Sequence, residues 1–385
     1  MITTPLSEAI VRGVAELEPT DRGLRLHRLP AWARRQLPDP QLLSMEAQPA
    51  GARVVFRTSA TRVELETLTS RAVYVGAERP RGRVDAYVDG VPIASDALTE
   101  GDRVEVDLAT GATAAYAGRT HTTTLTGLAD ADKRIELWLP HNEAVTLVAL
   151  RTDAPVQPAP SAAPLWIHHG SSISQGSAAL APSRTWTAVA ARAAGLDLRN
   201  LGFGGAAMVD AAVARVIRDS PADVISVKLG INVVNADAMR MRAFVPAVHG
   251  FLDTIRDGHP DTPLLLVTPL HCGIHERTPG PGAFDPRSLG TEQVRFIATG
   301  DPADVAQGRL TLETIRAALT DVAARRDDDP HLRWVDGTAL YGPEDEAAHP
   351  LPDRLHPDAP THELIGTRFA AEVGALASAR RAGPR

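Results

Sequence analysis

A short serine-rich segment is the first place in this chain where catalytic chemistry could arise. Residues 170–176 read Gly-Ser-Ser-Ile-Ser-Gln-Gly and follow a strand-like run that begins at Leu165. The flanking glycines would let the chain turn sharply where a side chain is presented to a substrate. A serine hydroxyl is a weak nucleophile at neutral pH, so it needs a base within hydrogen-bond reach and donors for the oxyanion that forms on attack. Alone, the segment fits a solvated turn equally well.

A carboxylate and an imidazole lie close together near the C-terminus. Asp353 and His356 are three residues apart in the segment DRLHP. Within one local turn, this spacing can bring the carboxylate to the imidazole, where it fixes the ring tautomer and stabilises the imidazolium, as a Ser-His-Asp triad requires. Taken by itself, the pair also fits a surface turn without function.

Two further segments could supply oxyanion donors. NLGFGG, at residues 200–205, follows a second strand-like run and places glycines where a backbone N–H could approach a ligand. Gly230-Ile231-Asn232 follows a third such run and offers a side-chain amide. The glycines could instead be turn residues and Asn232 a helix cap. All four segments at strand ends, in this order, are hard to attribute to chance.

In these four blocks the sequence resembles the SGNH or GDSL hydrolases, whose serine, glycine, asparagine and aspartate-histidine blocks occur in this order on a flavodoxin-like sheet. The resemblance covers roughly the last two-thirds of the chain. It implies that Ser172 is the nucleophile, His356 the base and Asp353 the residue that orients the base. It also implies an oxyanion hole formed by the Ser172 amide, Gly205 and Asn232.

The blocks depart from the family at two positions. Ser171 stands where the family has an aspartate beside the nucleophile, and Val233 stands where an aspartate often follows the asparagine. Neither lost carboxylate belongs to the triad, so the departures bear on loop geometry. The G-x-S-x-G signature of the α/β-hydrolase fold is absent at Ser172, because Ser174 occupies the place of its second glycine. This rules against the main rival fold.

The segments around the four blocks alternate between strand-like and helical patterns. After the first strand, helices are predicted near residues 239–256 and 310–326, and a closing helix from about Thr361. Apolar strands alternating with helices are typical of an α/β fold with a parallel sheet covered on both faces. Such sheets bind ligands at the carboxyl ends of their strands, which is where the four blocks fall.

The chain before these blocks has a different pattern. Residues 45–155 contain short β-rich runs broken by Gly, Asp, Pro and Asn, which predict an all-β sandwich of jelly-roll type. Residues 1–44 form an N-terminal segment, 156–164 a Pro- and Ala-rich linker, and 165–385 the hydrolase domain. This order resembles two-domain carbohydrate esterases, which implies an acetylated sugar as substrate.

A Pro- and Gly-rich connection at residues 271–291 is longer than an ordinary strand-helix loop, so it is predicted to be a lid or wall of the active site. His271 and Glu276 within it are candidate pocket residues. With His275 they would share one face of a helix and could bind a metal, but the Pro-Gly run favours a loop, and no metal site is predicted. His169 is a further candidate for the pocket, although a packing role fits it better.

Several other residues are expected to be structural. Trp166 and Trp186 occupy apolar positions beside the serine block and are predicted to lie in the core. Lys228 lies within an apolar strand, so we expect a carboxylate partner or an exposed tip. Cys272 is the only cysteine, which excludes an internal disulfide and a thiolate cluster, and it is predicted to be a buried, inert thiol.

Composition limits the partners. The 385 residues carry a formal net charge of −7, from 47 acidic and 40 basic side chains spread along the chain. No basic stripe suggests nucleic acid or an anionic membrane as partner. The first thirty residues lack a basic start followed by an unbroken apolar run, and no segment offers the roughly 18 apolar residues of a spanning helix. A cytoplasmic location is therefore expected.

The sequence thus predicts a serine-dependent carboxylic ester hydrolase that works through an acyl-enzyme, without a cofactor, on a sugar ester or another small ester. An acyltransferase would use the same residues and deliver the acyl group to an alcohol other than water. In a third interpretation, the β-domain binds carbohydrate and the second domain is catalytically inert. An added acceptor alcohol separates the first two, and fluorophosphonate labelling tests the third.

Overall fold

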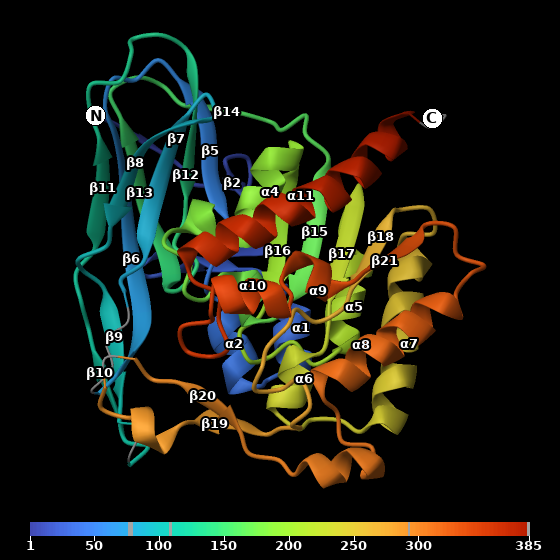
Figure 1. Ribbon diagram of the computed structural model, residues 1–385. Helices are drawn as coiled ribbons and strands as arrows, with labels where there is room; N and C mark the ends of the chain where they lie inside the picture. The colour runs from blue at the N-terminus through green and yellow to red at the C-terminus, as the bar shows by residue number, and fades with distance from the viewer. Residues whose placement is uncertain (76–79, 108–109, 292, 383–385) are drawn as a thin grey trace. The chain divides into compact units, whose positions relative to one another are not determined.

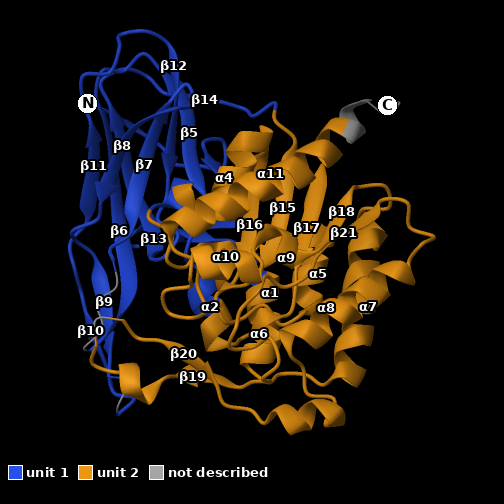
Figure 2. Cartoon of the chain, in the orientation of Figure 1, with its two compact units in different colours: residues 1–31, 43–162, 181–183 blue, residues 32–42, 163–180, 184–385 orange. Residues whose placement is uncertain are grey.

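The computed structural model describes residues 1–75, 80–107, 110–291 and 293–382 (Figure 1). Part of the predicted sandwich (76–79, 108–109) and the last residues of the predicted hydrolase domain (383–385) therefore lie outside the described residues. The chain divides into two compact units, which Figure 2 colours separately. The β unit contains residues 1–31, 43–162 and 181–183, and the α/β unit contains residues 32–42, 163–180 and 184–385.

Two sheets build the β unit. Within the described residues, one sheet has eight strands, in the order β10-β9-β6-β13-β4-β3 with β1 on β13 and β11 on β6. Its strands are β1 (Ile2–Thr4), β3 (Glu16–Thr20), β4 (Gly23–His27), β6 (Val63–Tyr74), β9 (Asp102–Val106), β10 (Thr113–Tyr116), β11 (His121–Leu125) and β13 (Ala144–Thr152). The other sheet runs β14-β5-β12-β7-β8, with β2 on β5. Its strands are β2 (Val11–Arg12), β5 (Arg53–Thr58), β7 (Arg83–Val88), β8 (Val91–Ala97), β12 (Lys133–Trp138) and β14 (Gln157–Pro158).

The two sheets share one hydrophobic core. Phe56 and Leu137 from one sheet and Leu65 and Val145 from the other belong to the same buried cluster. Burial alternates along β12 and β13, as expected when one face of a strand meets a core and the other does not. A core shared by two facing sheets is the arrangement of a β-sandwich, as the sequence predicts.

The structure differs from the sequence-based expectation at the edges of this unit. Residues 1–31 are not a separate segment, because β1 to β4 pair within the two sheets. The Pro-rich stretch near residue 157 contains β14, which pairs with β5. These strands have two to five residues, too few to show the alternation that identifies a strand in a sequence.

A five-stranded parallel sheet organises the α/β unit, in the order β16-β15-β17-β18-β21. Its strands are β15 (Leu165–Gly170), β16 (Asp197–Gly202), β17 (Val224–Lys228), β18 (Leu264–Val267) and β21 (Leu332–Val335). This is the flavodoxin-like order 2-1-3-4-5 that the resemblance implies. In such a sheet the strand order reverses between the first and third strands, and ligands bind at the carboxyl ends there. The serine block follows β15 and the asparagine block follows β17.

Helices and a hairpin complete the described elements. They are α1 (Ala31–Gln36), α2 (Pro40–Glu46), α3 (Ser172–Gln175), α4 (Trp186–Ala194), α5 (Ala211–Arg218), α6 (Ile231–Asn235), α7 (Met241–Gly258), α8 (Leu312–Ala324), α9 (Gly337–Leu340), α10 (Pro343–Ala348) and α11 (Ala359–Ala382). Short 3-10 turns are η1 (Pro182–Arg184), η2 (Pro286–Ser288) and η3 (Pro302–Gln307), and the hairpin is β19 (Gly282–Phe284) with β20 (Phe296–Ala298). Among the described helices, none combines the length and apolar character that a membrane crossing requires.

Helices cover both faces of the parallel sheet. His168 and His169 are consecutive residues of β15, so their side chains point to opposite faces. The His168 ring contacts Trp186 of α4 and Phe369 of α11, and these two helices pack against each other. The His169 ring stacks on Phe251 of α7, which packs against α5. The layered α/β architecture predicted from the sequence is therefore present.

Gly202, the last residue of β16, allows α3 to lie directly against the sheet. A Cβ at this position would be 2.4 Å from the backbone N of Gln175 and 2.6 Å from the carbonyl carbon of Ser174. Both atoms are backbone, so they could yield only if the whole short helix moved. Because α3 begins at Ser172, the position of that serine depends on the absence of a side chain at residue 202.

We expect Gly202→Ala to displace α3 without unfolding the protein. Overpacking of this kind costs about 1–3 kcal/mol of stability. Turnover of an ester substrate should fall far more than the melting temperature, since the Ser172 hydroxyl moves with the helix. Thermal unfolding and kcat, measured on the same preparation, check this. Gly250→Ala, in α7, is the control, because a Cβ there meets nothing within 4 Å. A fully active Gly202→Ala enzyme would contradict the expectation.

Candidate active site

The serine block forms a sharp strand-to-helix turn at the end of β15. Ser171 is extended, with φ −83° and ψ −163°, and precedes the single helical turn of α3. Gly176 ends that turn at φ +113°, a conformation that favours glycine. The Ser172 side chain begins α3 and is 8% exposed. Its N–H is at the first helical position, where no partner exists within the helix.

Three side chains form one hydrogen-bonded series. His356 Nε2 lies 2.9 Å from Ser172 Oγ, and His356 Nδ1 lies 2.7 Å from Asp353 Oδ2. The second carboxylate oxygen of Asp353 accepts hydrogen bonds from the backbone N–H groups of Leu355 and His356, at 2.9 and 2.7 Å. The short Asp-His spacing thus closes a local turn that directs the imidazole toward the serine, as the sequence suggested.

The Asp353 carboxylate is held in its charged form. Burial acts to raise its pKa, but the hydrogen bond and charge of His356 and the two backbone N–H donors outweigh burial, so the pKa lies below its ordinary value. The carboxylate is therefore ionised at neutral pH. Because the pKa is lowered on folding, the stabilisation is present above the ordinary carboxyl pKa and is lost as the pH falls through the lowered value.

The glycine and asparagine blocks follow β16 and β17, at the same edge of the sheet as the serine block. Asn232, in α6, is buried, and its Oδ1 accepts a hydrogen bond from the Ala207 N–H at 3.2 Å. This contact fixes the amide orientation and identifies Nδ2 as the end available to donate. Gly205 has φ +70°, in the left-handed region that favours glycine. The three donors implied by the resemblance thus follow β15, β16 and β17.

Two glutamines hold the glycine block in place. The Gly204 N–H donates to Gln175 Oε1 at 2.8 Å, and Gln41 Nε2 donates to the Gly204 carbonyl at 2.8 Å. Sequence reasoning missed both residues. Gln175 belongs to the serine block, so the motif could have pointed to it. Gln41 lies in α2, 163 residues away along the chain, and no pattern in the sequence marks it.

A buried polar cluster supports α3 from the sheet side. His168 hydrogen-bonds with Ser174 Oγ at 2.8 Å and with Ser226 Oγ at 2.7 Å. Asn200 Nδ2 donates to the Ser174 carbonyl at 2.8 Å. Burial, together with the charges of Lys228 and His169, lowers the pKa of His168 well below its ordinary value. His168 is therefore neutral and acts as a packing and hydrogen-bonding residue.

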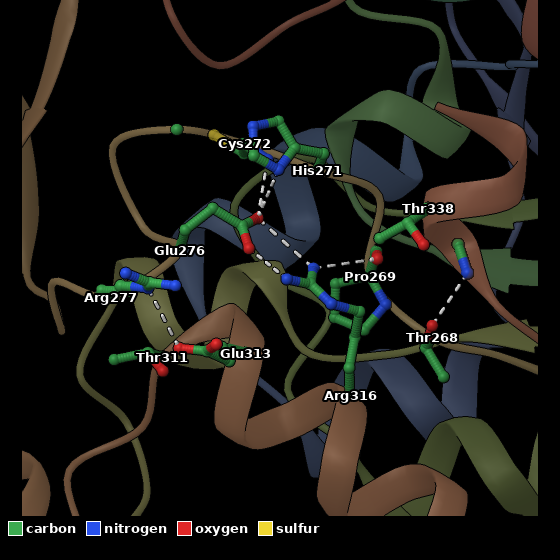
Figure 3. A network of polar contacts seen from close by, with 12 residues as sticks. Thr268, Pro269, His271, Cys272, Glu276, Arg277, Thr311, Glu313, Arg316 and Thr338 are labelled. Carbon is green, nitrogen blue, oxygen red and sulfur yellow. Dashed lines mark hydrogen bonds and ion pairs between the residues drawn. The ribbon is translucent and has the colours of Figure 1, made fainter. Parts of the chain in front are cut away.

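The connection after β18 is held by an ionic network (Figure 3). Glu276 forms an ion pair with Arg316 of α8 and lies 3.2 Å from His271 Nδ1. His271 Nε2 in turn lies 2.9 Å from Glu346 of α10. The Cys272 N–H also donates to Glu276, at 3.0 Å. The two candidate pocket residues of this loop therefore bind each other and fix the base of the connection, and their contact with a substrate stays a prediction.

Cys272 joins this base to the Asp-His turn. Its Sγ donates to the Arg354 carbonyl at 3.3 Å, and Arg354 has a left-handed φ of +68°. The thiol is 2% exposed, and burial, together with the nearby charges of Glu346 and Glu276, raises its pKa. The thiol is therefore buried, as predicted.

A hairpin in the same connection reaches the imidazole. The Phe296 N–H donates to the Asp353 carbonyl at 2.8 Å, and the Phe296 ring lies edge-on to the His356 ring with centroids 5.7 Å apart. The predicted wall at residues 271–291 ended before Phe296, so sequence reasoning missed this contact. The length of the connection indicated the right region, but only tertiary structure brings residue 296 to residue 356.

Other predicted positions have structural surroundings. His169 is fully buried, and its Nδ1 lies 2.8 Å from the Leu201 carbonyl, which suits packing rather than contact with substrate. Trp166 and Trp186 are fully buried in the core, as predicted. Lys228 is buried, and burial lowers its pKa to about 8. The expectation of an exposed tip or a carboxylate partner is wrong, because no ion pair to Lys228 occurs within the part of the chain that is described.

The candidate metal ligands of this connection have other partners in the structure. Within residues 1–75, 80–107, 110–291 and 293–382, no group of three or more His, Cys, Asp or Glu side chains is arranged to hold a metal ion. His271 and Glu276, which could have contributed to such a site, are engaged with Glu346 and Arg316 instead.

A family of known proteins matches the part of the chain that contains the serine, glycine and asparagine blocks. Residues 165–274 match the GDSL-like lipase/acylhydrolase family. The match includes Ser172, Gly205 and Asn232, while Asp353 and His356 lie beyond it. A search of curated proteins found no match to this chain.

Solved structures resemble both parts of the chain. The salicylyl-acyltransferase SsfX3 from a tetracycline biosynthetic pathway is 28% identical, with a TM-score of 0.76 over 97% of this chain and 96% of its own. A Bacteroides ovatus protein named as a GDSL-like lipase is 17% identical, with a TM-score of 0.68 over 95% of each chain. A family two carbohydrate esterase from Cellvibrio japonicus is 12% identical, with a TM-score of 0.55 over 98% of each chain. These structures share the fold of this chain, an α/β domain preceded in the sequence by a β-sandwich.

Asp353→Asn tests the role of this half-buried carboxylate. The substitution keeps the shape but removes the charge, and an amide facing Nδ1 favours the wrong imidazole tautomer. We expect kcat for p-nitrophenyl acetate to fall by about 10⁴-fold, with a much smaller change in KM.

Two further variants make this test specific. Asp358→Asn is the matched control, since Asp358 also accepts a hydrogen bond from a nearby backbone N–H, that of Thr361, but does not contact the imidazole. Adding Asp353→Asn to His356→Ala should cause little further loss, because triad residues act as one unit. A nearly wild-type Asp353→Asn enzyme would show that another group orients His356.

Proposed function

We propose that this protein is a serine-dependent acyl-transfer enzyme that hydrolyses carboxylic esters through an acyl-enzyme. One observation carries the proposal: Ser172, His356 and Asp353 form a continuous hydrogen-bonded series at the carboxyl edge of the parallel sheet. In that series the hydroxyl has a base within reach, and the base has a carboxylate on its other nitrogen. The family match supports the same reaction class.

In the first half of the reaction, Ser172 Oγ attacks the ester carbonyl while His356 Nε2 takes its proton. The charged Asp353 stabilises the imidazolium that results. The carbonyl oxygen becomes an oxyanion, which the N–H groups of Ser172 and Gly205 and the Nδ2 of Asn232 stabilise. The bond to the alcohol oxygen then breaks, and His356 returns its proton to that oxygen. In the second half, water attacks the acyl-enzyme by the same route and the acid leaves.

Transfer to an alcohol is the second candidate, and one observation favours it. The chain is 28% identical over nearly its whole length to a protein named as a salicylyl-acyltransferase. An acceptor alcohol would take the place of water in the second half-reaction, and His356 would remove its proton. The same residues serve both outcomes, so access of water to the acyl-enzyme decides between them.

For the substrate, we propose an ester of a sugar or another small alcohol. The fold that this chain shares with family two carbohydrate esterases supports a sugar ester, although below 25% identity that likeness concerns the fold. An inert carbohydrate-binding protein is disfavoured, because such a protein would have no need to keep the three side chains within hydrogen-bond distance.

Ser172→Ala should abolish turnover and leave the fold intact. We expect kcat to fall by at least about 10⁴-fold across p-nitrophenyl acetate, butyrate and octanoate and a set of acetylated sugars. Ser171→Ala is the control, because the neighbouring Ser171 hydroxyl is buried and has no hydrogen-bond partner within the described chain. Fluorophosphonate should label wild type and Ser171→Ala but not Ser172→Ala. If Ser171→Ala were inactive and Ser172→Ala active, the nucleophile would be Ser171 instead of Ser172.

Partitioning of the acyl-enzyme separates hydrolysis from transfer. With p-nitrophenyl acetate and increasing concentrations of an acceptor alcohol, a hydrolase should release acetic acid in nearly constant yield. A transferase should instead form the new ester in proportion to the alcohol and release p-nitrophenol faster when deacylation limits the rate. Chromatographic yields of acid and ester, with Ser172→Ala as the blank, measure the ratio. Ester formation that dominates at low alcohol concentration would overturn assignment as a hydrolase.

A further inference from the structure

The hairpin of β19 and β20 presents two aromatic rings on one side. Phe284 and Phe296 are directly opposite each other in the antiparallel pair. Residues in this relation project to the same face of a two-stranded ribbon. Their ring centroids are 5.0 Å apart, within the range of favourable aromatic contact. We call these two side chains the aromatic pair.

One ring of the aromatic pair contacts the imidazole of His356, and the other ring is exposed to solvent. The Phe296 ring lies edge-on to His356, at 5.7 Å and an interplanar angle of 76°. Its N–H donates to the Asp353 carbonyl, so backbone and ring both fix it to the Asp-His turn. Phe284 lies beyond Phe296 and is 38% exposed. Apolar surface therefore continues outward from the imidazole.

The reaction determines which part of an ester meets this surface. The proton that His356 takes from Ser172 must pass to the oxygen of the departing alcohol, so that oxygen lies within hydrogen-bond reach of Nε2. The carbonyl oxygen lies instead among the donors of Ser172, Gly205 and Asn232. A ring in contact with the imidazole is therefore on the alcohol side of the substrate.

We infer that the aromatic pair of Phe284 and Phe296 selects esters whose alcohol part carries an apolar face, such as an aryl or alkyl ring. The inference rests on the proposed function and adds a substrate class to it. Contact of an apolar group with Phe284 removes apolar surface from water on both partners, which favours binding. A small alcohol such as ethanol is too short to extend from Nε2 to Phe284 and gains nothing from it. When an alcohol acts as acceptor, it enters the same position and is selected in the same way.

Pairs of esters that differ only in the alcohol part, or only in the acyl part, test this selectivity. The alcohol preference is the ratio of kcat/KM for 2-phenylethyl acetate to that for ethyl acetate, which share their acyl group. The acyl preference is the ratio for ethyl 3-phenylpropanoate to ethyl acetate, which share their alcohol. Wild-type enzyme should favour the 2-phenylethyl ester. Phe284→Ala should lower the alcohol preference by about tenfold, the size of one lost aromatic contact, and leave the acyl preference in place.

Two controls separate the aromatic pair from general effects. Phe284→Leu retains apolar volume and should keep most of the alcohol preference. Trp334→Ala removes an exposed aromatic side chain from β21 and should alter neither ratio. Two results would overturn the inference: a Phe284→Ala enzyme that loses the acyl preference instead, or a wild-type enzyme that shows no alcohol preference. In either case, Ser172-dependent hydrolysis of ethyl acetate would still support the proposed function. Absence of Ser172-dependent turnover with every ester would overturn both.

Discussion

The 2.9 Å contact between His356 Nε2 and Ser172 Oγ is the interaction on which the rest of this site depends, and it joins residues 184 positions apart. Neither residue is useful without the other, because the hydroxyl needs the base and the base needs a proton donor in a fixed place. The parallel sheet makes the contact by ending β15 at the edge where the turn before α11 lies. The strand order reverses beside β15, the place where ligands bind in sheets of this kind.

Burial gives this contact its electrostatic character. The Asp353 carboxylate is mostly withdrawn from water, yet three hydrogen bonds keep it ionised, so it can stabilise a charge that forms on the imidazole. His168, a few residues before the serine, is buried too deeply to be charged and serves to hold α3. The two histidines near Ser172 thus have different surroundings, because His356 contacts Asp353 and His168 contacts two serine hydroxyls.

The connection after β18 is fixed at two places, its base and its hairpin. Its base is fixed by the Glu276–Arg316 pair and by His271 between two carboxylates, and its hairpin is fixed to Asp353 and His356. Solved structures with related folds include a named acyltransferase and carbohydrate esterases. A shared sheet does not determine which ester reacts, so the distinction must lie in segments such as this connection.

The sequence alone determined the class of chemistry and the order of the elements. Ser172, Asn232, Asp353 and His356 stand in short local motifs, and strand and helix periodicity extends over enough residues to be read from single segments. Tertiary structure decided what no local pattern encodes. Gln41 and Phe296 reach the site from distant segments. Lys228 is buried without a carboxylate partner among the described residues, and the first 31 residues pair into the sandwich through strands too short to recognise. Local motifs are visible in a sequence because their residues interact with near neighbours, whereas these contacts exist only after the sheets have formed.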